Sequence, residues 1–295
     1  MKVNKKYLMV GVEQGSDEWK ALRLSHVTAS NVPCIFEKSP YKTRLQYYEE
    51  LSTKSERLSP VFQKVLDLGH ATEVVGRKYV TETYGMTFDP AVVISTRLPA
   101  LLASLDGFNE SENLVFESKY VGEEVLKGVR EKVLPEHHHY QVQAQLLATG
   151  AERCIYFARA PSGEAAVLES LPDNEVIDSI AERVAAFMEM VKSGNAPEPG
   201  AKDWIDVNDP EFDELYRLKL ISDSASDAYD EMKKSLDKRY TDQQRVRAGN
   251  MTMYRSLVKG SIPYSTLKEV KSLDLEKHRS KPRLQVTFKP IKIKE

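Results

Sequence analysis

Apolar residues follow two periodicities along this chain, and together they predict a mixed α/β protein. Helical spacing, with apolar positions three to four residues apart, alternates with short apolar runs that end at turn-forming residues. The predicted helices cover residues 16–24, 29–36, 43–51, 58–84, 135–149 and 174–193. The predicted strands cover residues 86–95, 101–106, 114–119, 153–159 and 165–171. We therefore expect a central sheet of mixed direction, flanked by helices.

The turn-rich stretch from Gly194 to Gly200 is the best candidate for a domain boundary. We expect a core domain over residues 1–199 and an extension over residues 200–295. Within the extension, the pattern predicts a long charged helix over 210–240, a hairpin or loop over 243–264 and a late strand over 284–293. The extension is too short and too charged to form a core of its own, so we expect it to dock on the core domain.

Charged residues are distributed unevenly along the chain. The 295 residues carry a formal net charge of −2, but residues 231–295 hold 17 Lys and Arg against 7 Asp and Glu, a net +10. A basic segment binds phosphate without regard to base sequence; the alternative is a solvated helical surface.

There is no run of ~18 apolar residues and no charged-then-apolar leader, and only Cys34 and Cys154 are present, so we expect a cytoplasmic protein with reduced thiols.

Two adjacent predicted strands carry the residues with the clearest chemistry. Ser104 and Asp106 share one face of the first strand, and Glu117 and Lys119 share one face of the second. Because the turn-forming residues 107–113 join these strands as a hairpin, the side chains can converge. Carboxylate oxygens bind Mg²⁺, which in turn activates water and offsets charge on a leaving oxygen. The pattern favours a metal-dependent phosphodiesterase, although a solvated hairpin with exposed charges fits these common residues as well.

Other candidates lie on the predicted helices. Glu73 is a mid-helix residue and Arg23 closes the first helix; each is also compatible with an ordinary solvated side chain. His138, Gln141 and Gln145 share a helix face that suits contact with phosphate, or is simply exposed. The run from His137 to His139 does not predict zinc, because three successive helical side chains diverge by about 100° each.

Six short motifs in one order resemble the YqaJ-like viral recombinase family, which includes lambda exonuclease-like enzymes. They span about Gly15 to Arg159, half of the chain, and comprise Gly15-Ser16-Asp17-Glu18-Trp19, Val27-Thr28-Ala29-Ser30, Ser39-Pro40-Tyr41, Gly69-His70-Ala71-Thr72-Glu73, Ser104-Leu105-Asp106-Gly107 with Glu117-Ser118-Lys119, and Tyr140-Gln141-Val142-Gln143. The resemblance implies a PD-(D/E)XK nuclease core that binds two Mg²⁺ or Mn²⁺ ions and digests one strand of duplex DNA from its 5′ end. It also implies a ring-shaped homo-oligomer, a single-strand annealing partner and a phage or prophage origin in a bacterial host.

Carried over position by position, the resemblance assigns a role to each candidate. Asp106, Glu117 and the Ser118 carbonyl would bind metal, Glu73 would complete the acidic cluster, and Lys119 would be the catalytic lysine. The positions that would hold the 5′-phosphate or the scissile region are Arg23, Ser30, Ser104 and Gln141. The sequence departs from the family pattern at Leu105, where proline is usual, and after Lys119, where Cys-Pro often follows.

Two rival hypotheses remain open. One is a nuclease of different specificity, such as an endonuclease or a 3′-end trimmer, that uses the same metal site. The other is a DNA-end-binding recombination module that has lost catalysis, although Asp106, Glu117 and Lys119 are all present.

Overall fold

The computed structural model describes residues 6–55, 60–204, 208–242, 245–248 and 251–254. The chain divides into two compact units, Met1–Ile205 and Asp206–Glu295. Across these described residues, none of the helices combines the length and the apolar character needed to cross a membrane.

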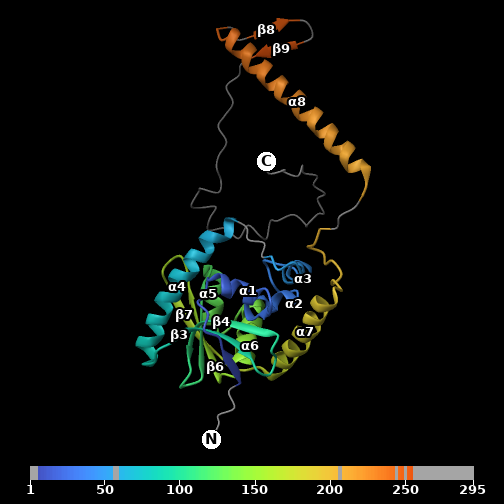
Figure 1. Ribbon diagram of the computed structural model, residues 1–295. Helices are drawn as coiled ribbons and strands as arrows, with labels where there is room; N and C mark the ends of the chain where they lie inside the picture. Colours follow the sequence, from blue (N-terminus) through green and yellow to red (C-terminus); the bar gives the residue numbers. More distant parts are fainter. Residues whose placement is uncertain (1–5, 56–59, 205–207, 243–244, 249–250, 255–295) are drawn as a thin grey trace. The chain divides into compact units, whose positions relative to one another are not determined.

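The first unit is built on a seven-stranded sheet of mixed direction (Figure 1). Its main path runs β1-β3-β4-β5-β6-β7, and β2 pairs alongside β4. The strands are β1 (Tyr7–Met9), β2 (Val27–Thr28), β3 (Asp89–Ser95), β4 (Leu101–Asn109), β5 (Leu114–Tyr120), β6 (Arg153–Arg159) and β7 (Ala165–Ser170). Pairing is parallel for β5 with β6 and for β2 with β4, and antiparallel elsewhere. The predicted mixed sheet is confirmed.

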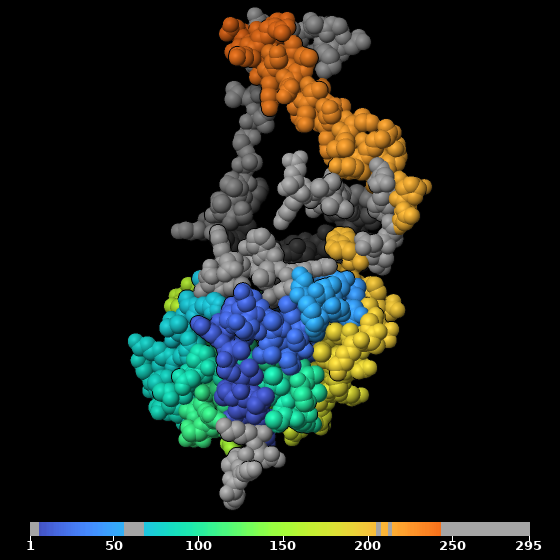
Figure 2. Space-filling view, viewed as in Figure 1, coloured from blue at the N-terminus to red at the C-terminus, as the bar shows by residue number. Residues whose placement is uncertain are grey.

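Helices cover both faces of this sheet. The face with α4 (Pro60–Tyr84) holds a small aromatic core around Phe116 and Phe157, and the opposite face holds the larger core that includes α6 (Glu136–Thr149) and α7 (Asn174–Ser193). Figure 2 shows the light-blue α3 segment beside the yellow α7 segment on the visible face. The remaining helical elements of this unit are α1 (Asp17–Arg23), the 3-10 turn Ala29–Asn31, α2 (Val32–Ile35), α3 (Arg44–Thr53) and α5 (Glu123–Arg130).

Glycine allows α4 to approach the sheet closely at one point. A Cβ atom at Gly76 would lie 2.8 Å from the rings of both Phe116 and Phe157. By contrast, no described atom lies within 4 Å of a Cβ placed at Gly69. The close approach of α4 to β5 and β6 therefore depends on the absence of a side chain at Gly76.

We predict that Gly76→Ala destabilises the protein by about 1–3 kcal/mol, because the added methyl group overpacks the aromatic core. Gly69→Ala is the matched control on the same helix, and we expect it to be neutral or to stabilise by up to ~1 kcal/mol through helix propensity. Urea denaturation measures both. Equal free energies of unfolding for the two variants would contradict the claim that a side chain at Gly76 clashes with the aromatic core.

The second unit contains α8 (Pro210–Arg239) and an antiparallel hairpin of β8 (Arg245–Ala248) and β9 (Met251–Tyr254). The side chain of Asp209 caps the start of α8, and Pro210 occupies its first turn, where a missing N–H costs nothing. The predicted long helix is confirmed, and β8 and β9 form a hairpin within the range 243–264. The rest of that range and the strand predicted over 284–293 lie outside the described residues. Docking of the extension on the core domain stays a prediction.

Candidate active site

Asp106 lies where β4 and β5 separate. The ladder between the two strands runs from Asn109↔Leu114 to Gly107↔Phe116. Beyond the Gly107↔Phe116 pair the backbone ladder stops. There the Oδ2 atom of Asp106, instead of a backbone carbonyl, accepts the Ser118 N–H at 2.8 Å. This hydrogen bond fixes the Asp106 carboxylate next to β5, the strand that carries Glu117 and Lys119.

Glu117 is buried, with only 1% of its surface exposed, and all its partners are donors. The Lys119 ammonium contacts Glu117 Oε1, as the alternation of side chains along β5 predicts. Two amides from α6 complete the set: Gln141 Nε2 donates to Oε1 at 2.6 Å, and Gln145 Nε2 donates to Oε2 at 2.6 Å. A buried carboxylate needs such partners to remain in the fold.

The local electrostatics couple these groups. Burial raises the pKa of Asp106 well above its usual range, and the nearby charges of Glu117 and Glu73 raise it further, against an opposing effect of Lys119. For Lys119, burial alone would lower the pKa, but the charges of Glu117 and Asp106 outweigh it and raise the pKa above its ordinary value. Lys119 therefore stays protonated here, and Asp106 holds its proton more tightly than an ordinary carboxylic acid does.

The helix α6 is buried from Gln141 to Thr149, so its polar residues need partners inside the protein. His138 Nδ1 lies 2.7 Å from the hydroxyl of Tyr156, and burial, then Lys119 and His137, lowers the pKa of His138 to about 2. The exposed-face interpretation of this helix is wrong, because His138, Gln141 and Gln145 are all buried. Contact of these residues with phosphate stays a prediction. No group of three or more His, Cys, Asp or Glu side chains suited to a metal occurs in the described part of the chain, which includes His137–His139.

Glu73 reaches the site from the opposite face, on α4. Its carboxylate lies 3.4 Å from His70 Nδ1 and 3.7 Å from Arg77 Nη1. The same Arg77 nitrogen donates to the backbone carbonyl of Asp106 at 2.7 Å. Arg77 thus links Glu73 to the strand that carries Asp106, and its place one turn after Glu73 on a helix is the only sequence signal that would have identified it.

A pocket lined by residues of α1, α3 and the segment between them includes Arg23, while Ser30 and Ser104 are connected to its lining residues by hydrogen bonds and ring contacts. Its lining includes Arg23, Thr28, Asn31, Tyr47 and Glu50. The Arg23 guanidinium stacks over the Trp19 ring at 4.5 Å, and the indole Nε1 of Trp19 donates to Ser104 Oγ at 2.8 Å.

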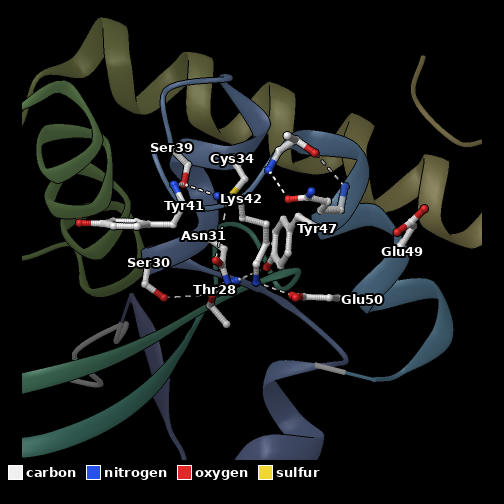
Figure 3. Close-up of polar contacts among 12 residues, drawn as sticks. Thr28, Ser30, Asn31, Cys34, Ser39, Tyr41, Lys42, Tyr47, Glu49 and Glu50 are labelled. Carbon is white, nitrogen blue, oxygen red and sulfur yellow. Dashed lines mark hydrogen bonds and ion pairs between the residues drawn. The ribbon is translucent and has the colours of Figure 1, made fainter. Parts of the chain in front are cut away.

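A polar network connects residues of the pocket lining to Ser30 and Lys42 (Figure 3). Thr28 Oγ1 lies 3.3 Å from Ser30 Oγ and accepts from Asn31 Nδ2 at 3.0 Å, and the Thr28 amide donates to the hydroxyl of Tyr47 at 3.0 Å. Lys42 forms an ion pair with the buried Glu50. Ser30 is exposed and sits on this network, as a residue that contacts a ligand would.

The donor set at Asp106 and Glu117 fits a divalent cation in its chemistry. Hard cations prefer carboxylate and carbonyl oxygens, and the raised pKa of Asp106 arises from repulsion and burial that a positive ion would relieve. Asp106, Glu117 and the Ser118 carbonyl are the groups that would hold the ion. The metal-binding role of Glu73 stays a prediction.

Comparisons with known proteins relate this chain to one protein family and to several solved structures. Residues 18–152 match the model of the YqaJ-like viral recombinase domain. Among solved structures, the chain is similar to the alkaline exonuclease LHK-Exo from Laribacter hongkongensis, with 20% identity and a TM-score of 0.52 over 61% of this chain and 94% of that chain. LHK-Exo in complex with dAMP gives 21% identity and a TM-score of 0.53 over the same shares. None of the curated proteins matches. The likeness to the exonuclease shows a common fold.

Proposed function

We propose that this chain, which contains a YqaJ-like viral recombinase domain over residues 18–152, is a metal-dependent DNA exonuclease. Its substrate would be linear double-stranded DNA, digested from the 5′ end of one strand. The product would be a duplex with 3′ single-stranded tails, which is the substrate of single-strand annealing.

The observation that carries this proposal is the buried contact between Glu117 and Lys119 beside Asp106. A half-buried lysine beside two carboxylates, one of them fully buried, is costly for stability unless these groups serve a function. A half-buried ammonium beside carboxylate oxygens suits hydrolysis of a phosphodiester. In that reaction a metal ion held by the oxygens and the lysine ammonium would both face the same phosphate.

Each residue has a role in this reaction. Divalent ions, when bound, would lower the pKa of a coordinated water and neutralise charge on the leaving 3′-oxygen. Lys119 would contact the attacked phosphate or orient the attacking water. The amides of Gln141 and Gln145 hold the carboxylate of Glu117 in one orientation, and contact of Gln141 with the scissile region is part of the same proposal.

The pocket beside α1 would hold the 5′-phosphate. The Arg23 guanidinium matches a phosphate with two parallel hydrogen bonds, and Ser30 supplies a hydroxyl, with Ser104 held nearby by Trp19. The LHK-Exo complex contains dAMP, a 5′-nucleotide, and this supports a nucleotide product for the same fold.

The remaining parts of the proposal concern assembly. We propose two Mg²⁺ or Mn²⁺ ions, a ring-shaped homo-oligomer around the DNA, and a single-strand annealing protein as partner. The basic residues after Glu231 would add phosphate affinity that falls as salt rises.

The test is digestion of linear duplex DNA in Mg²⁺, with 5′-phosphorylated ends compared with 5′-hydroxyl ends and with EDTA as a control. We expect metal-dependent loss of one strand that is faster from phosphorylated ends. End-labelled strands identify the rivals, since an endonuclease releases internal fragments first and a 3′-trimmer releases the 3′ label first. Binding of duplex without digestion would favour the inactive end-binding module.

A further inference from the structure

We propose that Tyr41, supported by His137, is a stacking platform for the base of the 5′-terminal nucleotide. This positioning role rests on the proposed function of the site. The Ser39-Pro40-Tyr41 motif takes no part in the metal site or in the phosphate contacts described above. Nevertheless, the ring of Tyr41 is 68% exposed, and a large aromatic face in water is a surface on which a nucleobase stacks.

The exposed ring is held in place rather than left free. The backbone N–H groups of Tyr41 and Lys42 both donate to Ser39 Oγ, at 3.2 and 3.3 Å. The ring itself meets His137 edge to face, with centroids 6.0 Å apart and planes at 82°. A side chain fixed in this way loses little conformational entropy when a ligand stacks on it.

The loop that carries Tyr41 is fixed to the start of α6. The Phe36 ring stacks on Tyr140 with centroids 4.3 Å apart, and Lys38 forms an ion pair with Glu136 at 3.0 Å. The helix partners of these two contacts, Tyr140 and Glu136, lie on either side of His137 in the sequence, and His137 is the residue that Tyr41 contacts. The platform is therefore tied to the same helix that brings Gln141 to Glu117.

The position of the platform is defined relative to the proposed metal site and to the proposed phosphate pocket. His137 is close enough to Lys119 for the lysine charge to add to the effect of burial in lowering the pKa of His137. Figure 3 shows the Tyr41 ring pointing away from Glu50, which lines the proposed phosphate pocket, and from its ion-pair partner Lys42. In the proposed function, the 5′-terminal nucleotide would have its 5′-phosphate at Arg23 and Ser30 and its 3′-phosphodiester at Lys119. The proposal assigns its base to Tyr41, because this exposed aromatic residue contacts the helix that also carries Gln141 to Glu117.

Stacking suits an exonuclease that removes every nucleotide in turn. All four bases present an aromatic face, so a stacking contact binds them without reading their hydrogen-bonding edges. It also favours a terminal base that has left its pair, which separates the strand to be cut from its complement.

The experiment uses a 5′-phosphorylated duplex with 2-aminopurine as its 5′-terminal base, mixed with the full chain in EDTA so that no strand is cut. Stacking on an aromatic ring quenches the fluorescence of 2-aminopurine. We expect the wild type and Tyr41→Phe to quench it equally, and Tyr41→Ala to lose most of the quenching. Tyr229→Ala, which removes an exposed tyrosine of α8, is the matched control, and a duplex with internal 2-aminopurine should not respond.

In Mg²⁺, Tyr41→Ala should raise KM about tenfold with kcat within about twofold, as expected for loss of one stacked base, and Tyr41→Phe should restore KM. Unchanged quenching in Tyr41→Ala, or loss of quenching in Tyr41→Phe, would overturn the platform. The two proposals fail separately: digestion by a wild type that quenches nothing rejects the platform alone, whereas Tyr41-dependent quenching without digestion rejects the exonuclease alone.

Discussion

Lys119→Ala is expected to lower kcat for duplex digestion by about 10²–10⁴-fold, the usual loss when a positioned catalytic group is removed. Affinity for duplex in EDTA should stay within a few-fold, because the lysine acts on one phosphate while the rest of the DNA surface is kept. The physical reason is the contact of the ammonium with Glu117, which holds a positive charge next to the proposed metal ligands. Single-turnover digestion and equilibrium binding measure the two effects separately.

Lys127→Ala is the matched control, since Lys127 is an exposed lysine that pairs with Glu131 on α5. It should digest duplex at the wild-type rate. If Lys119→Ala also digests at that rate, the assignment of the site to β5 is wrong.

Asp106→Asn is expected to abolish digestion and, in EDTA, to make the fold more stable by roughly 0.5–2 kcal/mol, as removal of a strained active-site group often does. The folded state raises the pKa of Asp106 through burial and through Glu117 and Glu73. The folded protein therefore binds this proton more tightly than the unfolded chain does, and the free energy of unfolding of the metal-free protein falls as pH rises from the ordinary carboxylate pKa to the raised one. Asparagine keeps an acceptor for the Ser118 N–H but removes this pH dependence.

Thermal denaturation with and without Mg²⁺ tests the same residue as a ligand. Ion binding to the folded state raises the Tm of the wild type by mass action, and Asp106→Asn should lose this increase. Asp178→Asn, at an exposed carboxylate paired with Arg97, should keep it. Equal Mg²⁺ stabilisation of wild type and Asp106→Asn would place the ion elsewhere.

The sequence predicted most of the sheet because its strands are short apolar runs with clear turn signals. β6 and α7 have the predicted bounds, and the alternation along β5 correctly put Glu117 and Lys119 on one face. Three elements were missed. β1 and β2 have only three and two residues, too few for a periodicity, and α5 is a short helix within a charged stretch.

The part of the site that the sequence did not predict depends on long-range packing. The spacing of Gln141 and Gln145 showed that they share a helix face, but not that this face is buried against Glu117. Likewise, nothing local to Arg77 indicates that it reaches the Asp106 carbonyl on another element. Spacing gives the direction of a side chain on its own helix or strand, whereas its partner is decided by the topology.

The parallel pairing of β5 with β6 also affects the order in which the candidate site assembles during synthesis. Parallel neighbours require a crossover connection, and here the crossover contains α6, the helix whose amides hold Glu117. On the ribosome, β5 emerges before the helix and the strand that complete its surroundings. Because contacts distant in sequence form late in folding, we expect a nascent chain to hold no assembled candidate site until β6 has been synthesised and paired.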